Sequence, residues 1–118
     1  MDSFPSLNLI VIRFGNLEKA CRFYEALGIH LQPEQHGNGP PHFSAQFGDV
    51  TFELYPLGNS PITIATRLGF RVASVDDAIT AAQDSGGALV SAAVQTDQGY
   101  RAVIADPEGH RIELMQSR

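Results

Sequence analysis

The chain has 118 residues, a formal net charge of −5 and a single cysteine, Cys21. This length suits one domain with a modest core, which we expect to span residues 1–118. The acidic balance, without a basic block, argues against a nucleic-acid or anionic-membrane partner. The longest apolar run, residues 9–12, is too short to cross a bilayer, and no signal-peptide pattern opens the sequence. One cysteine permits no internal disulfide and fits a reducing, cytoplasmic setting.

The first half of the chain predicts a strand, a helix and three further strands. The strands are expected at residues 8–14, 29–32, 42–47 and 50–55, and the helix at residues 17–27. Asn16 is a favoured N-cap residue, and Gly28 follows the helix where its C-terminus favours glycine. Residues 34–41 are rich in glycine and proline, which predicts a loop. Gly48 and Asp49 predict a two-residue hairpin turn.

The predicted hairpin has one apolar and one polar face. A two-residue turn places Ser44 opposite Glu53 and His42 opposite Tyr55, and alternate residues of a strand share a face. We expect the apolar face to join the core. The polar face carries bulky groups, which is typical of the wall of a wetted cavity.

The second half repeats the pattern of the first. Strands are expected at residues 63–72, 89–94, 100–105 and 110–115, and Ser74 and Asp77 predict a capping box at the start of a helix. Residues 13–20 match residues 71–78, and residues 52–54 match residues 112–114. The repeat predicts an α+β fold made of two βαβββ modules, residues 7–57 and 62–118. Neither module alone buries both faces of its sheet, so the two must pack together.

Three segments resemble the vicinal oxygen chelate superfamily. They are residues 16–20 (Asn-Leu-Glu-Lys-Ala), 23–28 (Phe-Tyr-Glu-Ala-Leu-Gly) and 106–114 (Asp-Pro-Glu-Gly-His-Arg-Ile-Glu-Leu). The superfamily includes glyoxalase I, fosfomycin-resistance thiol transferases, extradiol dioxygenases and bleomycin-resistance binding proteins. The resemblance implies mixed sheets curled around a cavity and a homodimer, often with sites built from both subunits. One fold hosts several chemistries, so the resemblance does not choose the function.

The resemblance also implies where a metal would bind. Metal-using members place ligands on the first and last strands of each module, with two histidines on the first strands. In this chain these positions fall on Leu9, Glu53, Arg67 and Glu113. Leucine has no donor atom and arginine stays cationic, although two carboxylates could still hold a hard ion weakly. We therefore expect no bound metal and no other cofactor.

The candidate catalytic residues are Glu113, Glu53, Arg67 and His42. Arg67 could form a structural ion pair with the carboxylates, or present a bidentate fork to a substrate carboxylate, phosphate or carbonyl. His42 could act as a general acid or base, or be a hydrogen-bonded or solvent-facing histidine. The wider ligand-binding set shares one predicted strand face and comprises Leu9, Arg13, His42, Glu53, Tyr55, Arg67, Tyr100, Glu113 and Met115. Its tyrosines and methionine could equally fill a dimer seam.

The remaining histidines and the cysteine carry weaker signals. His36 lies in a glycine-rich loop that could form a lid over the cavity. With His42 it could form a metal-binding pair, but no rigid third ligand is apparent. His110 belongs to the closing turn and is expected to be structural, while His30 has no clear role. Cys21 lies on the apolar helix face, which predicts a buried, inert thiol.

Two functions remain open. The first is a small-molecule binding protein, similar to the bleomycin-resistance branch, that holds an antibiotic or metabolite without a metal. The acidic charge would suit a cationic or neutral ligand. The second is a lyase or isomerase for a small carbonyl compound, with Glu113 or Glu53 as base and Arg67 as electrophilic clamp. A metal-dependent glyoxalase or thiol transferase would need the missing histidines.

Overall fold

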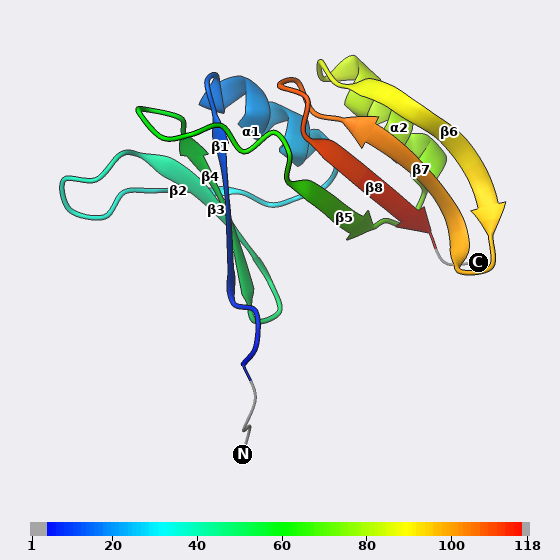
Figure 1. Ribbon diagram of the computed structural model, residues 1–118, viewed down its shortest axis with the longest axis horizontal. Coiled ribbons are helices and arrows are strands. Elements are labelled where there is room, and N and C mark those ends of the chain that lie inside the picture. The colour runs from blue at the N-terminus through cyan, green and yellow to red at the C-terminus, as the bar shows by residue number, and fades with distance from the viewer. Residues whose placement is uncertain (1–4, 117–118) are drawn as a thin grey trace.

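The computed structural model describes residues 5–116. It contains two four-stranded mixed sheets, each with one helix (Figure 1). The first sheet has the order β1-β4-β3-β2, and the second has the order β5-β8-β7-β6. The first module comprises β1 (Leu9–Phe14), α1 (Leu17–Ala26), β2 (Gln32–Glu34), β3 (His42–Phe47) and β4 (Val50–Pro56). The second comprises β5 (Arg67–Arg71), α2 (Val75–Asp84), β6 (Ala88–Thr96), β7 (Gly99–Ala105) and β8 (Arg111–Gln116). The predicted α+β fold of two βαβββ modules is confirmed.

The register of the strands confirms the predicted repeat. In each sheet the first strand lies parallel to the last, with Val11 opposite Glu53 and Gly69 opposite Glu113. The two carboxylates therefore occupy equivalent places in the two modules. The hairpin turn is also as predicted, because Gly48 has φ of +59°, a conformation that glycine adopts without steric cost.

Two predicted strands were placed wrongly along the chain. The strand expected at residues 29–32 is β2, which begins only at Gln32 and contains Pro33. Proline is tolerated there because β2 is an edge strand, while Ile29 and Leu31 are buried in the core instead. The strand expected at residues 63–72 is shortened to Arg67–Arg71.

Helix α1 packs its apolar face against both sheets. The ring centroid of Tyr24 lies 6.0 Å from that of Phe14 and 5.7 Å from that of Phe52 in the first sheet. It also lies 6.4 Å from the ring of Phe70 in the second sheet. One fully buried tyrosine therefore contacts the cores of both modules.

The modules approach closely at Gly87. A Cβ atom at this position would lie 2.4 Å from the ring of Phe23 in α1 and 2.5 Å from the carbonyl oxygen of Ala105. Both distances are far below van der Waals contact. The first shows that α1 can rest on the second module only at a glycine, and the second that a side chain here would also collide with β7.

The closing turn is organised by the buried carboxylate of Asp106. Its Oδ1 accepts the backbone N–H groups of Glu108, Gly109 and His110 at 2.9–3.0 Å. Its Oδ2 accepts the hydroxyl of Tyr24 at 2.7 Å and lies 2.9 Å from Nδ1 of His110. Burial raises the pKa of Asp106, but the nearby His110 ring and the hydrogen bond from Tyr24 outweigh it and hold the pKa below its usual value. Burial raises the pKa of Tyr24, and the charge of Asp106 and the hydrogen bond to it raise it further.

The same turn fastens the second module to the first helix. The carboxylate of Glu108 accepts the backbone N–H groups of Gly15 and Asn16 at 2.8 and 2.7 Å, just before α1 begins. A negative charge is favourable at this end of a helix. His110 is buried and its Nε2 lies 2.8 Å from Oγ1 of Thr63, so its predicted structural role is confirmed.

The predicted helix caps are also confirmed. The side chain of Asn16 accepts the N–H of Lys19, and the side chain of Ser74 accepts the N–H of Asp77, both at 3.1 Å. Within residues 5–116, neither helix is long and apolar enough to cross a membrane.

We predict that Asp106→Asn lowers the free energy of unfolding by roughly 2–4 kcal/mol at neutral pH, because two buried donors lose a charged acceptor. The folded pKa of Asp106 is lowered, so its stabilisation is complete above the unfolded pKa of about 3.9 and is lost as the pH falls through the folded pKa. Urea unfolding of both proteins should therefore show the difference closing below about pH 4. A difference that stays constant down to strongly acid pH would contradict this role.

Candidate functional site

Three predicted ligand-binding residues stack on the polar face of the first sheet, away from α1. The rings of His42 and Tyr55 are parallel within 13°, with centroids 4.1 Å apart. The guanidinium of Arg13 lies 5.2 Å from the centroid of Tyr55, and its Nη1 donates to the carbonyl of Pro56 at 3.2 Å. The stack holds His42 in one orientation at the end of the sheet.

The glycine-rich loop between β2 and β3 brings His36 close to His42. The N–H of Gly39 donates to the carbonyl of His36, and the amide of Gln35 donates to the carbonyl of Gly39, both at 2.9 Å. The ring of His36 lies 5.1 Å from that of His42, whose side chain is only 1% exposed. His42 is therefore buried, so the alternative of a solvent-facing histidine is wrong.

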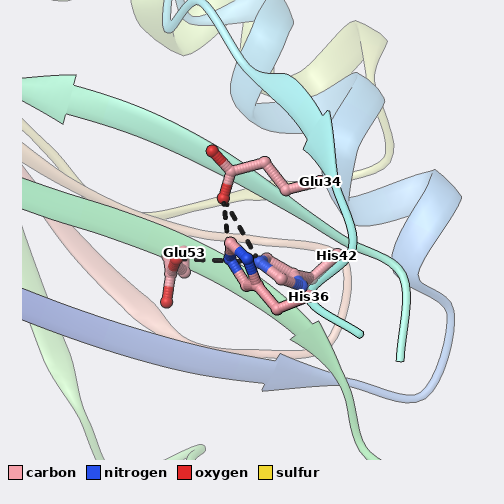
Figure 2. A group of neighbouring side chains, drawn as sticks. All are labelled: Glu34, His36, His42 and Glu53. Atoms are coloured by element: carbon pink, nitrogen blue, oxygen red, sulfur yellow. Dashed lines mark ion pairs between the residues drawn. The ribbon is translucent and has the colours of Figure 1, made fainter. Parts of the chain in front are cut away.

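Two histidines and two glutamates converge where β2 ends and β3 begins. We call them the histidine–glutamate cluster; its members are Glu34, His36, His42 and Glu53 (Figure 2). Oε1 of Glu34 lies 3.5 Å from Nε2 of His36 and 3.3 Å from Nε2 of His42. Oε2 of Glu53 lies 3.7 Å from Nε2 of His42. Two carboxylates and two imidazoles at this separation can hold a proton or a cation between them.

The sequence identified three members of this cluster but missed Glu34. Residue 34 was predicted to begin a loop, whereas it ends β2 directly opposite His42. The spacing of Glu34 and His36, which are two residues apart, could have indicated the fourth member. Side chains with this spacing share a face when the chain is extended.

In the second sheet Glu113 has a cationic partner that the sequence did not indicate. Arg101 in β7 forms an ion pair with Glu113 in β8. Glu113 and Met115 line a cavity of about 420 Å³ on this side of the sheet, together with Arg71 and Gln98. Glu113 and Glu53 lie in different sheets, and the cavity at Glu113 is not lined by Glu53.

Tyr100 does not share the predicted face. It lies opposite Gln116 in the β7–β8 pair, so it points to the side opposite Met115. Its hydroxyl donates to Oδ1 of Asp76 in α2 at 3.0 Å, and this hydrogen bond raises the pKa of Tyr100. The prediction that Tyr100 and Met115 form one wall is wrong, because the pairing of β7 sets the parity of its side chains.

A larger cavity lies between the two modules, on the apolar side of the first sheet. This inter-module pocket has a volume of about 460 Å³ and is lined by Leu7, Ile10, Phe47, Val50, Phe52, Arg67, Leu68, Gly69, Phe70 and Arg71. One residue of the predicted ligand-binding set, Arg67, lines this pocket. The other members of that set remain predictions for ligand contact.

Three phenylalanines form an aromatic wall in this pocket. The ring centroids of Phe47, Phe52 and Phe70 lie 5.8–6.1 Å from one another, and Phe47 is 42% exposed. Within residues 5–116, Arg67 makes neither a hydrogen bond nor an ion pair. The alternative of a structural ion pair between Arg67 and the glutamates is therefore not found among the described residues.

Comparison with known proteins identifies the family. A family model described as Glyoxalase/Bleomycin resistance protein/Dioxygenase superfamily matches residues 6–114. The chain belongs to this superfamily. It is also 30% identical over 105 residues to an uncharacterized protein of Mycolicibacterium smegmatis, a match that covers 88% of this chain and 87% of the relative.

Solved structures of other proteins share the fold. TnmS3, an antibiotic binding protein from a Streptomyces species, has a TM-score of 0.76 and 27% identity, with 100% of both chains covered. A glyoxalase/bleomycin resistance protein/dioxygenase family enzyme from Burkholderia phytofirmans has a TM-score of 0.76 and 19% identity, covering 97% of this chain and 100% of that chain. The neighbours therefore include a binding protein and an enzyme.

The residues of this chain do not fit the metal of the superfamily's metal-using members. Leu9 lies in β1 and Arg67 in β5, on the same sheet faces as Glu53 and Glu113 respectively. Leu9 and Arg67 therefore lie in the strands, and on the sheet faces, where the sequence placed them. An apolar side chain and a fixed cation there replace two donors, which leaves two carboxylates in separate sheets.

Cys21 in α1 is buried, as predicted, and is not available as a nucleophile. Burial, reinforced by the nearby carboxylate of Glu25, raises the pKa of the Cys21 thiol to about 11. Since the thiolate is the reactive form, the folded protein should react very slowly with a thiol reagent at neutral pH. We predict rapid labelling only in denaturant, measured by mass spectrometry. Rapid stoichiometric labelling of the folded protein would contradict a buried, inert thiol.

Proposed function

We propose that this protein binds a small organic ligand, an antibiotic or a metabolite, in the inter-module pocket. The observation that carries the proposal is a pocket lined both by the aromatic wall of Phe47, Phe52 and Phe70 and by Arg67. Aromatic rings offer a stacking surface, and arginine offers a bidentate donor. This combination suits a ligand with a flat ring system and a carboxylate, phosphate or carbonyl group.

The size and charge of the pocket support this choice of ligand. A volume of about 460 Å³ lies within the usual range of roughly 300–1,000 Å³ for small-molecule sites. None of the residues that line it is acidic. Although the net charge of the chain is −5, the local charge favours a neutral or anionic ligand over the cationic one that the overall composition suggested.

The antibiotic-binding neighbour supports a binding role. TnmS3 is described as an antibiotic binding protein, and its fold matches this chain along its full length. The ligand site that we propose uses no metal at the superfamily's metal position, which Leu9 and Arg67 occupy in this chain.

We further propose that the protein is a homodimer. Glu53 and Glu113 lie on faces of two different sheets, and the cavity at Glu113 is not lined by Glu53. A site that uses both faces would need a second copy, as the family resemblance implies.

The alternative enzyme function has one supporting observation. Arg67 and Glu113 share a face of the second sheet, on the neighbouring strands β5 and β8, with Gly69 directly opposite Glu113. Arg67 could therefore polarise a carbonyl near Glu113. The ion pair with Arg101 opposes this role, because Glu113 must be released before it takes a proton.

We predict that a thermal-shift screen of aromatic antibiotics and aromatic carboxylates yields a stabilising ligand that is recovered unchanged. Arg67→Ala should weaken its binding roughly 10–100-fold, the effect of a lost charge-assisted hydrogen bond, and Phe47→Ala should weaken it by loss of stacking. Titration calorimetry would measure both. Arg22→Ala, on the exposed side of α1, is the matched control and should bind normally. Equal affinities in all three variants would exclude the inter-module pocket.

The alternative function gives a different outcome. If the protein is a lyase or isomerase, a hit of the carbonyl class is converted, and Glu113→Gln should abolish turnover while binding persists. Product analysis by mass spectrometry would measure this. A ligand recovered unchanged from wild type and variant alike would contradict the enzyme.

A further inference from the structure

The strongest unexplained feature of the chain is the Nε2 atom of His42. This atom is fully buried, yet it has no hydrogen-bond partner among the described residues. Its only close polar neighbours in the histidine–glutamate cluster are carboxylate oxygens, 3.3 Å away on Glu34 and 3.7 Å away on Glu53. A buried polar atom without a partner is costly, so such a group calls for an occupant that the protein chain itself does not supply.

The tautomer of His42 is set by its other ring nitrogen. Nδ1 lies 3.1 Å from the carbonyl oxygen of Pro40, and a carbonyl can only accept, so Nδ1 carries the proton of that hydrogen bond. In the neutral ring, Nε2 then presents a lone pair to the two carboxylates. A backbone carbonyl that holds the distal N–H of a histidine is the usual outer support of a metal ligand.

The distances within the cluster match those between ligands of one small cation. Zinc–nitrogen and zinc–oxygen bonds of about 2.0–2.2 Å place tetrahedral ligand atoms about 3.3–3.6 Å apart. Three separations in the cluster are 3.3, 3.5 and 3.7 Å, and all four donor atoms lie within 4.8 Å of one another. Figure 2 shows the four side chains pointing toward one another; they belong to β2, the loop after it, β3 and β4.

We propose that the histidine–glutamate cluster is a binding site for a divalent transition-metal ion, with Zn²⁺ as the best match. Two imidazoles and two carboxylates form a mixed nitrogen and oxygen set that suits zinc, and the two negative charges neutralise the ion. This inference departs from the metal-free protein expected from the sequence. That expectation rested on Leu9 and Arg67, and of the superfamily's positions only Glu53 takes part here.

The site would be structural rather than catalytic. Four protein ligands complete a tetrahedral shell and leave no open position for substrate. Three ligands come from rigid strands, while His36 comes from the loop and is 71% exposed. The ion would thus tie the loop to the first sheet through His36.

The rival occupant is a proton. A His42 ring protonated on both nitrogens would donate to the carboxylates and satisfy Nε2 without a metal. The two occupants differ in their effect on His36, since a shared proton on His42 does not require the His36 ring, whereas tetrahedral coordination does.

The test is zinc titration of the full-length protein after removal of metal by a chelator. We expect one Zn²⁺ per chain by calorimetry and a rise in Tm. The Co²⁺-loaded protein should show the intense visible absorption of a tetrahedral site. His36→Ala and Glu34→Gln should each weaken Zn²⁺ binding at least about 10-fold, the lower end of what even outer-shell partners contribute. His36 is exposed, so its variant should keep the circular dichroism and Tm of the metal-free protein.

His30→Ala is the matched control, because this histidine lies outside the cluster. It should bind Zn²⁺ as the wild type does. The proposal is overturned if the wild type binds no stoichiometric Zn²⁺, or if all three variants bind it equally, which is the behaviour of adventitious surface binding. It is also overturned if nuclear magnetic resonance shows that Nε2 of His42 keeps a proton in the presence of Zn²⁺.

Discussion

The arrangement of the two modules depends on the contacts that the buried carboxylate of Asp106 makes. A buried carboxylate is costly unless its lone pairs are satisfied, and here three backbone N–H groups, the Tyr24 hydroxyl and the His110 ring surround it. The first three shape the closing turn of the second module. The tyrosine belongs to the helix of the first module, so one charged group fixes a local turn and a contact between modules.

The position of Tyr24 determines the inter-module pocket. Its hydroxyl is held by Asp106, while its ring packs against Phe52 and Phe70, two members of the aromatic wall. Glu108 supports the same geometry by accepting two N–H groups at the start of α1. The pocket is therefore built on a rigid junction rather than on loops, which favours a preformed binding site.

The two faces of strand β4 border two different sites. Phe52 points toward α1 and lines the inter-module pocket, while Glu53, the next residue, points to the opposite face and joins the histidine–glutamate cluster. A ligand in the pocket and an ion in the cluster would contact opposite sides of the same strand. The pocket offers aromatic rings and the arginines Arg67 and Arg71, whereas the cluster offers imidazole nitrogens and carboxylate oxygens.

The sequence by itself determined the repeat, the helix caps, the closing turn and the strand faces of Glu53 and Glu113, because these depend on local periodicity and on the turn preferences of individual residues. It also showed that Leu9 and Arg67 cannot act as metal ligands. Only the tertiary structure decided that Glu34 meets His36 and His42, that Arg101 pairs with Glu113, and that Tyr100 turns away from Met115. Those outcomes depend on the start of an edge strand, the path of a loop and the pairing of β7, which are set by packing between segments distant in the chain.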